Sequence, residues 1–381
     1  MASSPLLLLA ILCGSVVLSE WLVRRTFLRH LGTALVVIIV VAVWANLGLI
    51  PSASRGSAVY DGVFEYLAPL SIFYLLLDVN LASIRRAGAP MLLLFLLGSG
   101  ATAVGVLAGM YLIDGPTHFG QFYPAISGMF TGTYTGGSVN FNAIAIHYDM
   151  MREGVLYAGM TAVDNIITAV WMVVTLAVPM LLRRSGRLQP VPEVNAEEVE
   201  RETEAVSVLS IGILLGIGFL SLALSEAITV ALEGVGLSVP SILVLTTVAL
   251  VLAQVPAFHR LAGGQVLGLF FVYLFLAVIG AFCELAALGQ IGDLAWRLLV
   301  LVCVIVIVHG AIVFGVARLF GLDADVAAVA SQANIGGSSS ALALAKSLNR
   351  MDLYLPGILV GALGNGLGTY LGFLVAGLAG G

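Results

Sequence analysis

Two clusters of hydroxyl and amide side chains interrupt apolar stretches of this 381-residue chain, and each cluster contains a Gly-Gly pair. The strings are TGTYTGGSVNFN at 131–142 and SQANIGGSSS at 331–340. Glycine destabilises a helix by about 1 kcal/mol relative to alanine, and paired glycines beside Ser or Thr favour a kink or an unwound turn. The backbone N–H and C=O groups freed there can bind anions and cations respectively. The chemistry these residues predict is therefore binding of a polar solute or an ion.

Interrupted backbone is tolerated within a bilayer only where protein buries it or where it lines a water-filled cavity. Paired interruptions in two halves of a chain are typical of transporter sites. The alternative is that the small residues only permit close helix packing. The candidate substrate-binding residues are Thr133, Thr135, Gly136, Gly137, Ser138, Asn140 and Asn142 in the first cluster and Gln332, Asn334, Gly336, Gly337, Ser338, Ser339 and Ser340 in the second.

A carboxyl group and two amides follow the clusters, in TAVDNIITAV and GALGNGLGTY. Asp164 lies ten residues beyond Gly154, which is about 15 Å along a helix and near the middle of a ~30 Å hydrocarbon core. An Asp at that depth is unfavourable by roughly 2.5–3.5 kcal/mol and usually marks an ion pathway. We predict that Asp164, Asn165 and Asn365 bind a coupling ion; the alternative for Asp164 is a structural hydrogen-bonded network.

Two other ionisable side chains have less specific contexts. Lys346, the only lysine, lies two turns beyond Ser339 and either pairs with a substrate carboxylate or extends to the membrane interface. His309 falls near the middle of an apolar run, where a lone histidine is more often a hydrogen-bonded packing residue than a proton relay. The sequence favours packing for His309 and leaves both readings open for Lys346.

The composition requires that these residues be held in a membrane. Hydrophobic residues make up 60% of the chain and charged residues 10%, against ~25% charged in a soluble domain, and the mean hydropathy is +1.09. This excludes a water-soluble globule. The sequence shows no basic face of the kind that binds nucleic acid, and the cysteines lack the spacing of a metal site. Neither a GxxxxGK[ST] loop, which would bind ATP phosphates, nor an HExxH motif occurs. We therefore expect no enzyme, no cofactor, and no metal beyond Na⁺.

About twelve apolar segments have a length close to the roughly 20 residues that a helix needs to cross a membrane. We predict an all-α polytopic membrane protein with about 11–13 transmembrane helices, two of them discontinuous. The segments are 5–23, 31–50, 60–81, 89–112, 123–147, 154–182, 205–231, 239–257, 264–288, 294–318, 323–347 and 354–379.

The order of segment lengths is similar in the two halves of the chain. A shift of 200 positions aligns TGGSVNFNAIA at 135–145 with IGGSSSALALA at 335–345, which indicates an internal duplication. The predicted division is a first transmembrane repeat at 1–182, a charged linker at 183–204 and a second transmembrane repeat at 205–381. Arginines in the loops give opposite orientations for the two halves, whereas six segments in each half predict parallel repeats, so inverted and parallel arrangements both stay open.

FTGTYTGGSVNFNAIA together with SQANIGGSSSALALAKSL resembles the membrane family called domain of unknown function 819, over nearly the whole chain. More broadly, two interrupted helices, each followed by a helix with a central Asn or Asp, resemble the superfamily of cation/proton antiporters, sodium/bile-acid symporters and related anion transporters. The resemblance implies crossed discontinuous helices from inverted repeats, a mobile core domain, a panel domain and elevator-like alternating access. Asp164-Asn165 reverses the antiporter order, and no second carboxylate lies beside it, which argues against two-carboxylate proton antiport.

We expect a secondary active transporter, a sodium- or proton-coupled symporter, of a small polar organic solute such as a carboxylate, amino-acid derivative or short peptide. Half-helix N-termini would hold the anionic part of the solute, while Asp164 and carbonyls near the glycine pairs hold the cation. The alternative is a monovalent cation/proton antiporter that uses Asp164. The expected location is a bacterial inner (plasma) membrane. The expected partners are the lipid bilayer and the solute, with no nucleic acid, and the sequence leaves open whether the protein forms a homodimer.

Overall fold

The structure, a computed structural model, describes residues 4–30, 32–52, 57–77, 79–183, 206–237, 239–259, 261–283 and 292–380. Within these ranges it consists of helices and helical turns and has no strand. The predicted all-α class is therefore confirmed. The predicted charged linker lies outside the described residues beyond position 183.

Each predicted apolar segment contains a helix in the structure. Among the described residues, eight helices are long and apolar enough to cross a membrane, so the protein is a multi-pass membrane protein. They are α1 (Pro5–Arg25), the run of α3 (Ala58–Gly62), η3 (Val63–Leu67) and α4 (Ala68–Leu76), α5 (Ala89–Leu112), α9 (Gly154–Arg183), α10 (Val208–Gly234), α13 (Gly264–Phe282), α14 (Gly292–Leu319) and α16 (Tyr354–Gly380).

Four further helices complete the predicted set. Two are shorter apolar helices, α2 (Gly32–Asn46) and α11 (Ser241–Leu252). The other two contain the Gly-Gly clusters: one is split into α7 (Tyr123–Gly136) and α8 (Ser138–His147), and the other is α15 (Ala324–Ser347). These two carry the candidate substrate-binding residues.

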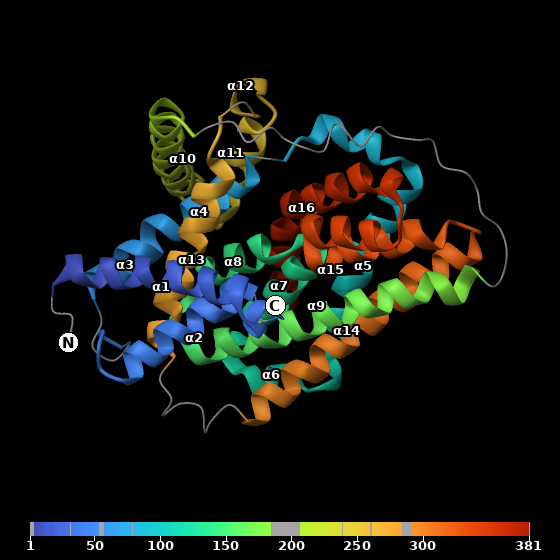
Figure 1. Cartoon of the computed structure of the whole chain (residues 1–381), viewed down its shortest axis with the longest axis horizontal. Helices are drawn as coiled ribbons and strands as arrows, with labels where there is room; N and C mark the ends of the chain where they lie inside the picture. The colour runs from blue at the N-terminus through green and yellow to red at the C-terminus, as the bar shows by residue number, and fades with distance from the viewer. Residues whose placement is uncertain are drawn as a thin grey trace.

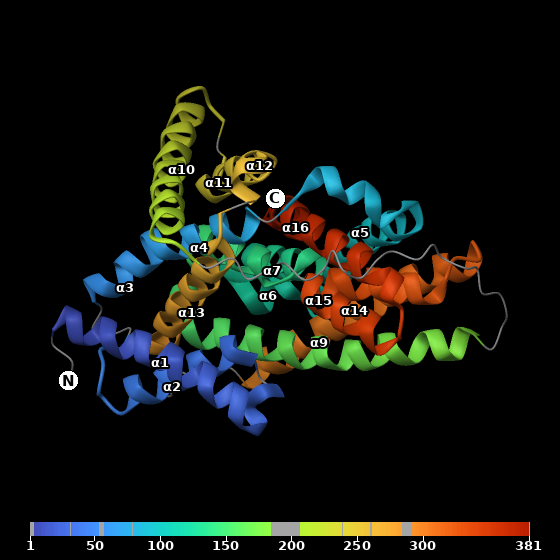
Figure 2. The same ribbon diagram turned by 45° about the horizontal axis from the view of Figure 1, so that its top comes forward.

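The helices form two groups that lie side by side (Figures 1 and 2). In one group α13 packs on α2 and α4, and α10 and α11 pack beside α4. In the other group α14 packs on α5, and α16 lies against both α7 and α15. The long green helix α9 runs along both groups in both views, and it contacts α2 and α13 as well as α14 and α15.

The first interrupted helix breaks at its glycine pair. α7 begins with Pro124 in its first turn, where the missing N–H group has no helical partner to lose. It ends at Gly136, and Gly137 has φ 105° and ψ 179°, a conformation that is open to glycine and strained for other residues. α8 resumes at Ser138, so the predicted break in this segment is confirmed.

The second interrupted helix breaks at the equivalent glycine. α15 begins after Asp323, whose side chain accepts a 2.8 Å hydrogen bond from the backbone N–H of Asp325 and so caps the helix. Inside α15, Gly337 has φ 75° and ψ −173°, which ends the first part of the helix and starts a second part at 338–347. The predicted break is again confirmed at the second glycine of the pair.

Helix α16 packs against both interrupted helices at glycine positions. A Cβ atom added to Gly364 would lie 2.6 Å from the Cα atom of Gly136 and 2.6 Å from the carbonyl oxygen of Thr135. A Cβ atom added to Gly361 would lie 2.5 Å from the backbone nitrogen of Ser338. All three distances are shorter than packed side chains tolerate, so the close approach of α16 depends on glycine at positions 361 and 364.

Candidate functional site

The two helix breaks meet. A Cβ atom built on Gly137 would lie 3.7 Å from the Cα atom of Gly337, and a Cβ atom built on Gly337 would lie 3.4 Å from the carbonyl oxygen of Gly136. Residues 200 positions apart therefore lie so close at the points where both helices lose their regular conformation that one added methyl group would bring them into contact. The two polar clusters form one structure rather than two separate ones.

Each break also starts a new helical segment, at Ser138 and at Ser338. The first N–H groups of a helix lack intrahelical partners and carry partial positive charge, and no side chain caps the start of α8. Asn365 of α16 reaches the same place, because its Oδ1 atom lies 3.9 Å from a Cβ position on Gly137. This side chain is partly exposed. The junction of the breaks therefore combines backbone donors with an accessible amide.

Carbonyl groups in the last turn of α7 are paired with neighbouring helices. The Tyr134 carbonyl accepts a 2.9 Å hydrogen bond from the Thr102 hydroxyl of α5. The Thr135 carbonyl accepts a 3.1 Å hydrogen bond from Nδ2 of Asn334 in α15. Each of these two oxygens therefore has a protein donor on one of its two lone pairs.

His309 of α14 lies at the centre of a buried hydrogen-bond network. Its Nδ1 atom lies 3.0 Å from the Gly98 carbonyl, which can only accept, so Nδ1 carries a hydrogen. Its Nε2 atom lies 2.9 Å from the Ser331 hydroxyl, which itself accepts a 3.0 Å hydrogen bond from Nε1 of Trp171. A neutral imidazole satisfies all these bonds. The interpretation of His309 as a hydrogen-bonded packing residue is confirmed.

Two asparagines of α8 fasten this helix to its neighbours. Asn140 donates from Nδ2 to the Gly364 carbonyl over 3.1 Å and accepts a 2.8 Å hydrogen bond from the Thr369 hydroxyl, both in α16. Asn142 accepts a hydrogen bond from the Tyr157 hydroxyl of α9. Both amide atoms of Asn140 and the Oδ1 atom of Asn142 are thus used within the protein.

Gln332 occupies the last turn before the second break. Its Oε1 atom accepts a 3.1 Å hydrogen bond from the Thr175 hydroxyl of α9, whereas its Nε2 atom is buried and has no hydrogen-bond partner among the described residues. Ser340, on the other side of the break, donates to the Gly337 carbonyl over 3.0 Å. This hydroxyl compensates one backbone oxygen that the break exposes.

Asp164 of α9 has an unsatisfied carboxyl oxygen. Its Oδ1 atom is buried and makes no hydrogen bond with the described residues, and the same holds for the Tyr134 hydroxyl. The Tyr134 hydroxyl is nevertheless the polar group that interacts with this carboxyl, at a geometry outside that of a regular hydrogen bond. Asp164 is partly exposed as a whole residue, as is Asn165 beside it. A carboxylate with one buried, uncompensated oxygen and a hydroxyl nearby is a set of oxygen atoms that a Na⁺ ion or a proton could complete.

The structure separates the candidate substrate-binding residues by accessibility. The buried ones are Thr133, Thr135, Gly136, Asn140, Asn142, Gln332, Asn334 and Gly337. Those that are exposed or partly exposed are Gly137, Ser138, Gly336, Ser338, Ser339 and Ser340. Only the second set can contact a solute without a change in the surrounding packing.

Sequence reasoning missed the residues that hold the breaks from outside the two clusters. They are Ser99 and Thr102 in α5 and Trp171 and Thr175 in α9. Each is a polar side chain in a hydrophobic helix, which is the signal that could have identified them. Lys346 does not join the site, because it is exposed and lies nine residues, or about 13 Å of helix rise, beyond Gly337.

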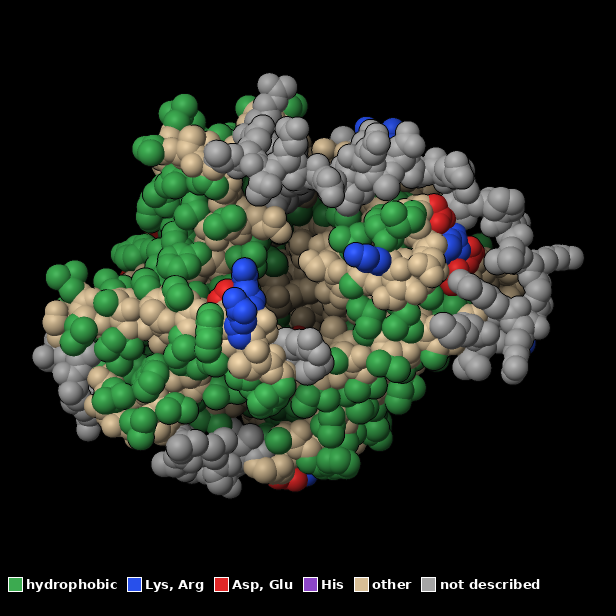
Figure 3. All heavy atoms as spheres, viewed as in Figure 1, with side chains coloured by type: hydrophobic (Ala, Val, Ile, Leu, Met, Phe, Trp, Pro, Cys, Tyr) green, Lys and Arg blue, Asp and Glu red, His purple; other side chains and the backbone are tan. Residues whose placement is uncertain are grey.

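The surface of the molecule is hollowed between the two groups of helices. Figure 3 shows this hollow at the centre of the face, between the part formed by α4 and α13 and the part formed by α15 and α16 in Figure 1. Its walls are mostly tan, the colour of backbone and of uncharged polar side chains, whereas the outer surface is largely hydrophobic. A polar hollow within an apolar exterior is consistent with a water-accessible region of a membrane protein.

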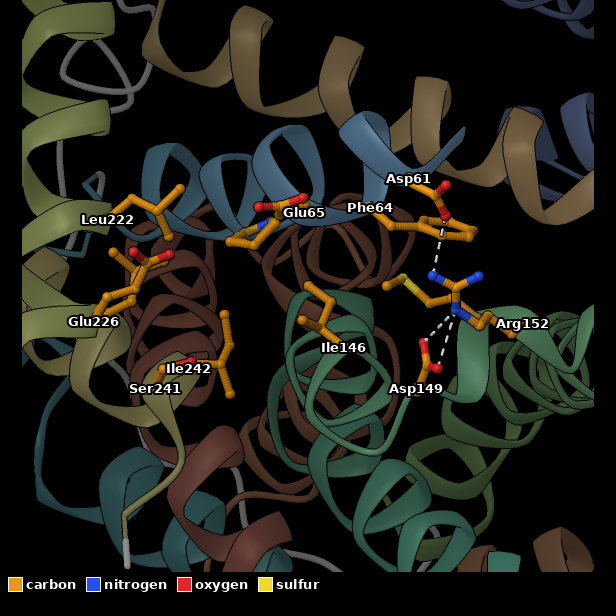
Figure 4. A pocket seen from close by; sticks show the side chains of 13 residues that line it. Asp61, Phe64, Glu65, Ile146, Asp149, Arg152, Leu222, Glu226, Ser241 and Ile242 are labelled. Carbon is orange, nitrogen blue, oxygen red and sulfur yellow. Dashed lines mark hydrogen bonds and ion pairs between the residues drawn. The ribbon is translucent and has the colours of Figure 1, made fainter. Parts of the chain in front are cut away.

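A separate cavity of about 380 Å³ lies at the end of α8 that is remote from the break (Figure 4). Four carboxylates line it, from Asp61, Glu65, Asp149 and Glu226. Arg152 bridges two of them, with 3.1 Å contacts to Asp61 and Asp149, while Glu65 and Glu226 lie on the other side of the cavity in Figure 4. The cavity is acidic, and its ion pairs join α3 to the turn that follows α8.

Comparisons with known proteins agree with a membrane protein. Residues 7–379 match the family described as "Protein of unknown function (DUF819)". The chain is also similar to the "Uncharacterized membrane protein YjcL" of Bacillus subtilis (strain 168), with 29% identity over 349 residues that cover 87% of this chain and 85% of the relative.

Proposed function

This chain belongs to the DUF819 family of proteins of unknown function, and from its own geometry we propose that it is a secondary active transporter of a small polar organic solute. Transport is driven by a Na⁺ or H⁺ gradient and proceeds by alternating access. The solute is a carboxylate, an amino-acid derivative or a short peptide. The protein catalyses no covalent reaction in this proposal.

The contact between the two helix breaks carries the proposal. Gly137 and Gly337 lie close together at the junction of four helix ends, with room for about one methyl group between them, and two of these ends offer N–H groups. In a membrane protein such irregular backbone is tolerated where it is buried or lines a water-filled cavity, and paired broken helices are a recurrent transporter site. The accessible side chains beside the junction, Ser138, Ser339 and Asn365, are neutral and polar, which suits an organic solute.

Asp164 supplies the coupling ion site in this proposal. Its buried Oδ1 atom has no hydrogen-bond partner among the described residues, and an unpaired carboxyl oxygen at this depth is unfavourable unless a cation or a proton compensates it. The nearby Tyr134 hydroxyl provides a second oxygen. Asn165, partly exposed beside Asp164, completes the candidate set.

The division into two groups of helices supports alternating access. The group that contains α5, α7, α14, α15 and α16 carries both breaks, and the group that contains α2, α4, α10, α11 and α13 lies beside it (Figure 2). We propose that the first group acts as the mobile core and the second as the panel of an elevator-like transporter with inverted repeats. We further propose that the family is related to the cation/proton antiporters and the bile-acid symporter-like anion transporters.

The unsatisfied carboxyl of Asp164 favours one second candidate function, a monovalent cation/proton antiporter. In that case Asp164 alternates between Na⁺ and H⁺, and no organic solute is needed. The two candidates make opposite predictions about solute binding, and one experiment separates them.

The test measures thermal unfolding of the detergent-purified protein with a panel of small acids, amino acids and dipeptides, with and without Na⁺. A ligand at 100 times its dissociation constant stabilises the folded state by roughly 2.7 kcal/mol. We expect a solute-dependent rise in the midpoint that requires the cation and disappears in Asp164→Asn. Uptake of the same solute into proteoliposomes should follow an imposed Na⁺ or pH gradient.

Asp114→Asn is the matched control, because Asp114 is exposed and its backbone has φ 52°, a conformation that Asn tolerates well. This variant should keep the full response. Stabilisation by Na⁺ or by pH alone, with no effect of any solute, selects the antiporter. A response that is identical in Asp164→Asn and in the unsubstituted protein removes Asp164 from the mechanism.

A further inference from the structure

In the second interrupted helix, the amide nitrogen of Gln332 is a buried donor without a partner among the described residues, and Oδ1 of Asn334 is a buried acceptor without one. The Gln332 side chain is fully buried, with 0% relative exposure, and Nε2 has no hydrogen-bond partner among the described residues. The other end of the same amide lies at the Thr175 hydroxyl, 3.1 Å from Oε1, and this hydroxyl shares its one hydrogen between Oε1 and the Trp171 carbonyl at 2.9 Å. Buried polar groups are nearly always paired, so an orphan donor requires an explanation.

The orphan donor points toward the break. A Cβ atom on Gly336, which is partly exposed, would lie 2.9 Å from Gln332 Nε2 and 3.0 Å from Ser340 Cβ. Gln332 Nε2 and Ser340 therefore lie on the same side of Gly336, one before the break and one after it. The second part of α15 begins here, and the first N–H groups of this segment have no intrahelical acceptor.

These groups share one chemical property: they are donors. The amide offers N–H hydrogens, and the start of a helix adds further N–H groups with partial positive charge. The only lysine of the chain lies about 13 Å of helix rise away, so the donors here are neutral. Such a set matches a carboxylate, which has two oxygens with several lone pairs and no donor of its own when ionised.

We propose that Gln332 Nε2 and the N-terminus of the second part of α15, at Ser338 and Ser339, bind the carboxylate of the transported solute, and that the solute reaches Nε2, which is buried in this structure, when the packing around the partly exposed Gly336 opens. This inference rests on the proposed function and adds its substrate class: an organic acid or an amino acid that carries a free carboxylate. Bound carboxylate oxygens supply the acceptor that Nε2 lacks.

The position of the coupling ion agrees with this assignment. Thr175, which holds Gln332, and Asp164 are eleven residues apart on α9, which corresponds to about 16 Å of helix rise. A solute carboxylate at Gln332 therefore does not lie beside the Asp164 carboxylate. Anion and cation occupy separate parts of the site.

The test compares each acid with its uncharged amide, so that only the carboxylate differs. The probes are succinate and succinamide, lactate and lactamide, and glutamate and glutamine, with ethanolamine as a cationic probe. Ligand-induced thermal stabilisation of the full-length protein in detergent is the readout. We expect at least one acid to stabilise the protein at concentrations at least tenfold lower than its amide, and ethanolamine to have no effect.

Gln332→Met is the informative variant. It removes the orphan donor and keeps the side-chain volume, and the Thr175 hydroxyl retains the Trp171 carbonyl as an acceptor at 2.9 Å. We expect the unliganded variant to be at least as stable as the unsubstituted protein, while it needs at least tenfold more acid for the same stabilisation. Gln332→Glu, which places a negative charge at the same point, should abolish the response. Gln121→Met and Gln121→Glu, at an exposed position, should leave it unchanged.

Three results overturn the carboxylate site and leave the proposed transporter in place: equal binding of acids and amides, preference for ethanolamine, or an unchanged acid response in both Gln332 variants. A protein that responds to Na⁺ through Asp164 but to none of the probes also overturns it and selects the antiporter. Absence of any response, to cations as well as to solutes, overturns both the carboxylate site and the proposed function.

Discussion

Asn334 of α15 donates a hydrogen bond from its Nδ2 atom to the carbonyl oxygen of Thr135, over 3.1 Å, and thereby joins the two interrupted helices. Both residues are fully buried. The same Nδ2 atom donates to the Ser99 hydroxyl over 3.0 Å. One side chain of the second broken helix thus satisfies a carbonyl that the end of the first broken helix leaves open, and it also ties both to α5.

Substitution of Asn334 by Ala should destabilise the protein by more than the loss of a few side-chain atoms would suggest. Asn334→Ala leaves the Thr135 carbonyl buried without a donor, and an unsatisfied buried group is unfavourable by about 1–3 kcal/mol. We expect a lower midpoint of thermal unfolding in detergent by that amount. Ser339→Ala, at an exposed position of the same helix, is the control and should have the same midpoint of thermal unfolding as the unsubstituted protein. Equal midpoints for both variants would show that the hydrogen bond contributes nothing.

The backbone conformation of Gly337 should make it intolerant of a side chain. A Cβ atom there meets only ordinary contacts, the nearest at 3.4 Å, but φ 75° with ψ −173° is strained for other residues by about 1–3 kcal/mol. Gly337→Ala should therefore lower stability by that amount and reduce ligand-induced stabilisation. The control is Gly159→Ala in α9, where a Cβ atom meets nothing within 4 Å and alanine favours the helix. An unfolding midpoint unchanged by Gly337→Ala would contradict the conformational argument.

The close packing of α16 on α7 should fail when Gly364 gains a side chain. A Cβ atom there would lie 2.6 Å from the Gly136 Cα atom, so Gly364→Ala forces the helices apart, and overpacking of this kind is unfavourable by about 1–3 kcal/mol. Gly377→Ala, in the same helix with nothing within 4 Å of its Cβ, provides the control. Thermal unfolding of the two variants should differ clearly; similar midpoints would mean that the α7–α16 contact relaxes without loss.

An ion cluster fixes the ends of α15 relative to each other. Arg350 donates to Asp352, Asp323 and Asp325 at 2.8 Å, and its side chain is 17% exposed. The accepting carboxylates, Asp352 first, raise the pKa of the Arg350 guanidinium above its ordinary value, so it stays charged at any pH at which the protein is studied.

Removal of this cation should leave Asp325, with 1% exposure, in a cluster of like charges. Breaking a buried ion pair destabilises a protein by about 3–5 kcal/mol, and we expect about 2–4 kcal/mol for Arg350→Met, since its partners are partly solvated. The control is Arg24→Met, which removes an exposed pair with Glu20 and should change stability by less than about 1 kcal/mol. Comparable losses in both variants would contradict a structural role of the cluster.

The sequence alone determined the membrane class, the helical segments and the places where two helices break. These are local properties. Apolar length specifies a segment that can cross a bilayer, and the second glycine of each pair can adopt a backbone conformation that other residues avoid. The pairs Gly136-Gly137 and Gly336-Gly337 could therefore be identified without knowledge of their neighbours, and the structure showed that the second glycine of each pair takes the non-helical conformation.

Only the tertiary structure decided what each polar side chain does. Gln332 and Asn334 are two residues apart in the same cluster, and the sequence assigns both of them to substrate binding. Both are fully buried in the structure. In the fold Asn334 faces a carbonyl of α7 and a hydroxyl of α5, while the nitrogen of Gln332 faces the break with no acceptor. A two-residue step rotates a side chain by about 200° around a helix, and the neighbouring helices it then meets are fixed by packing between segments far apart in the chain.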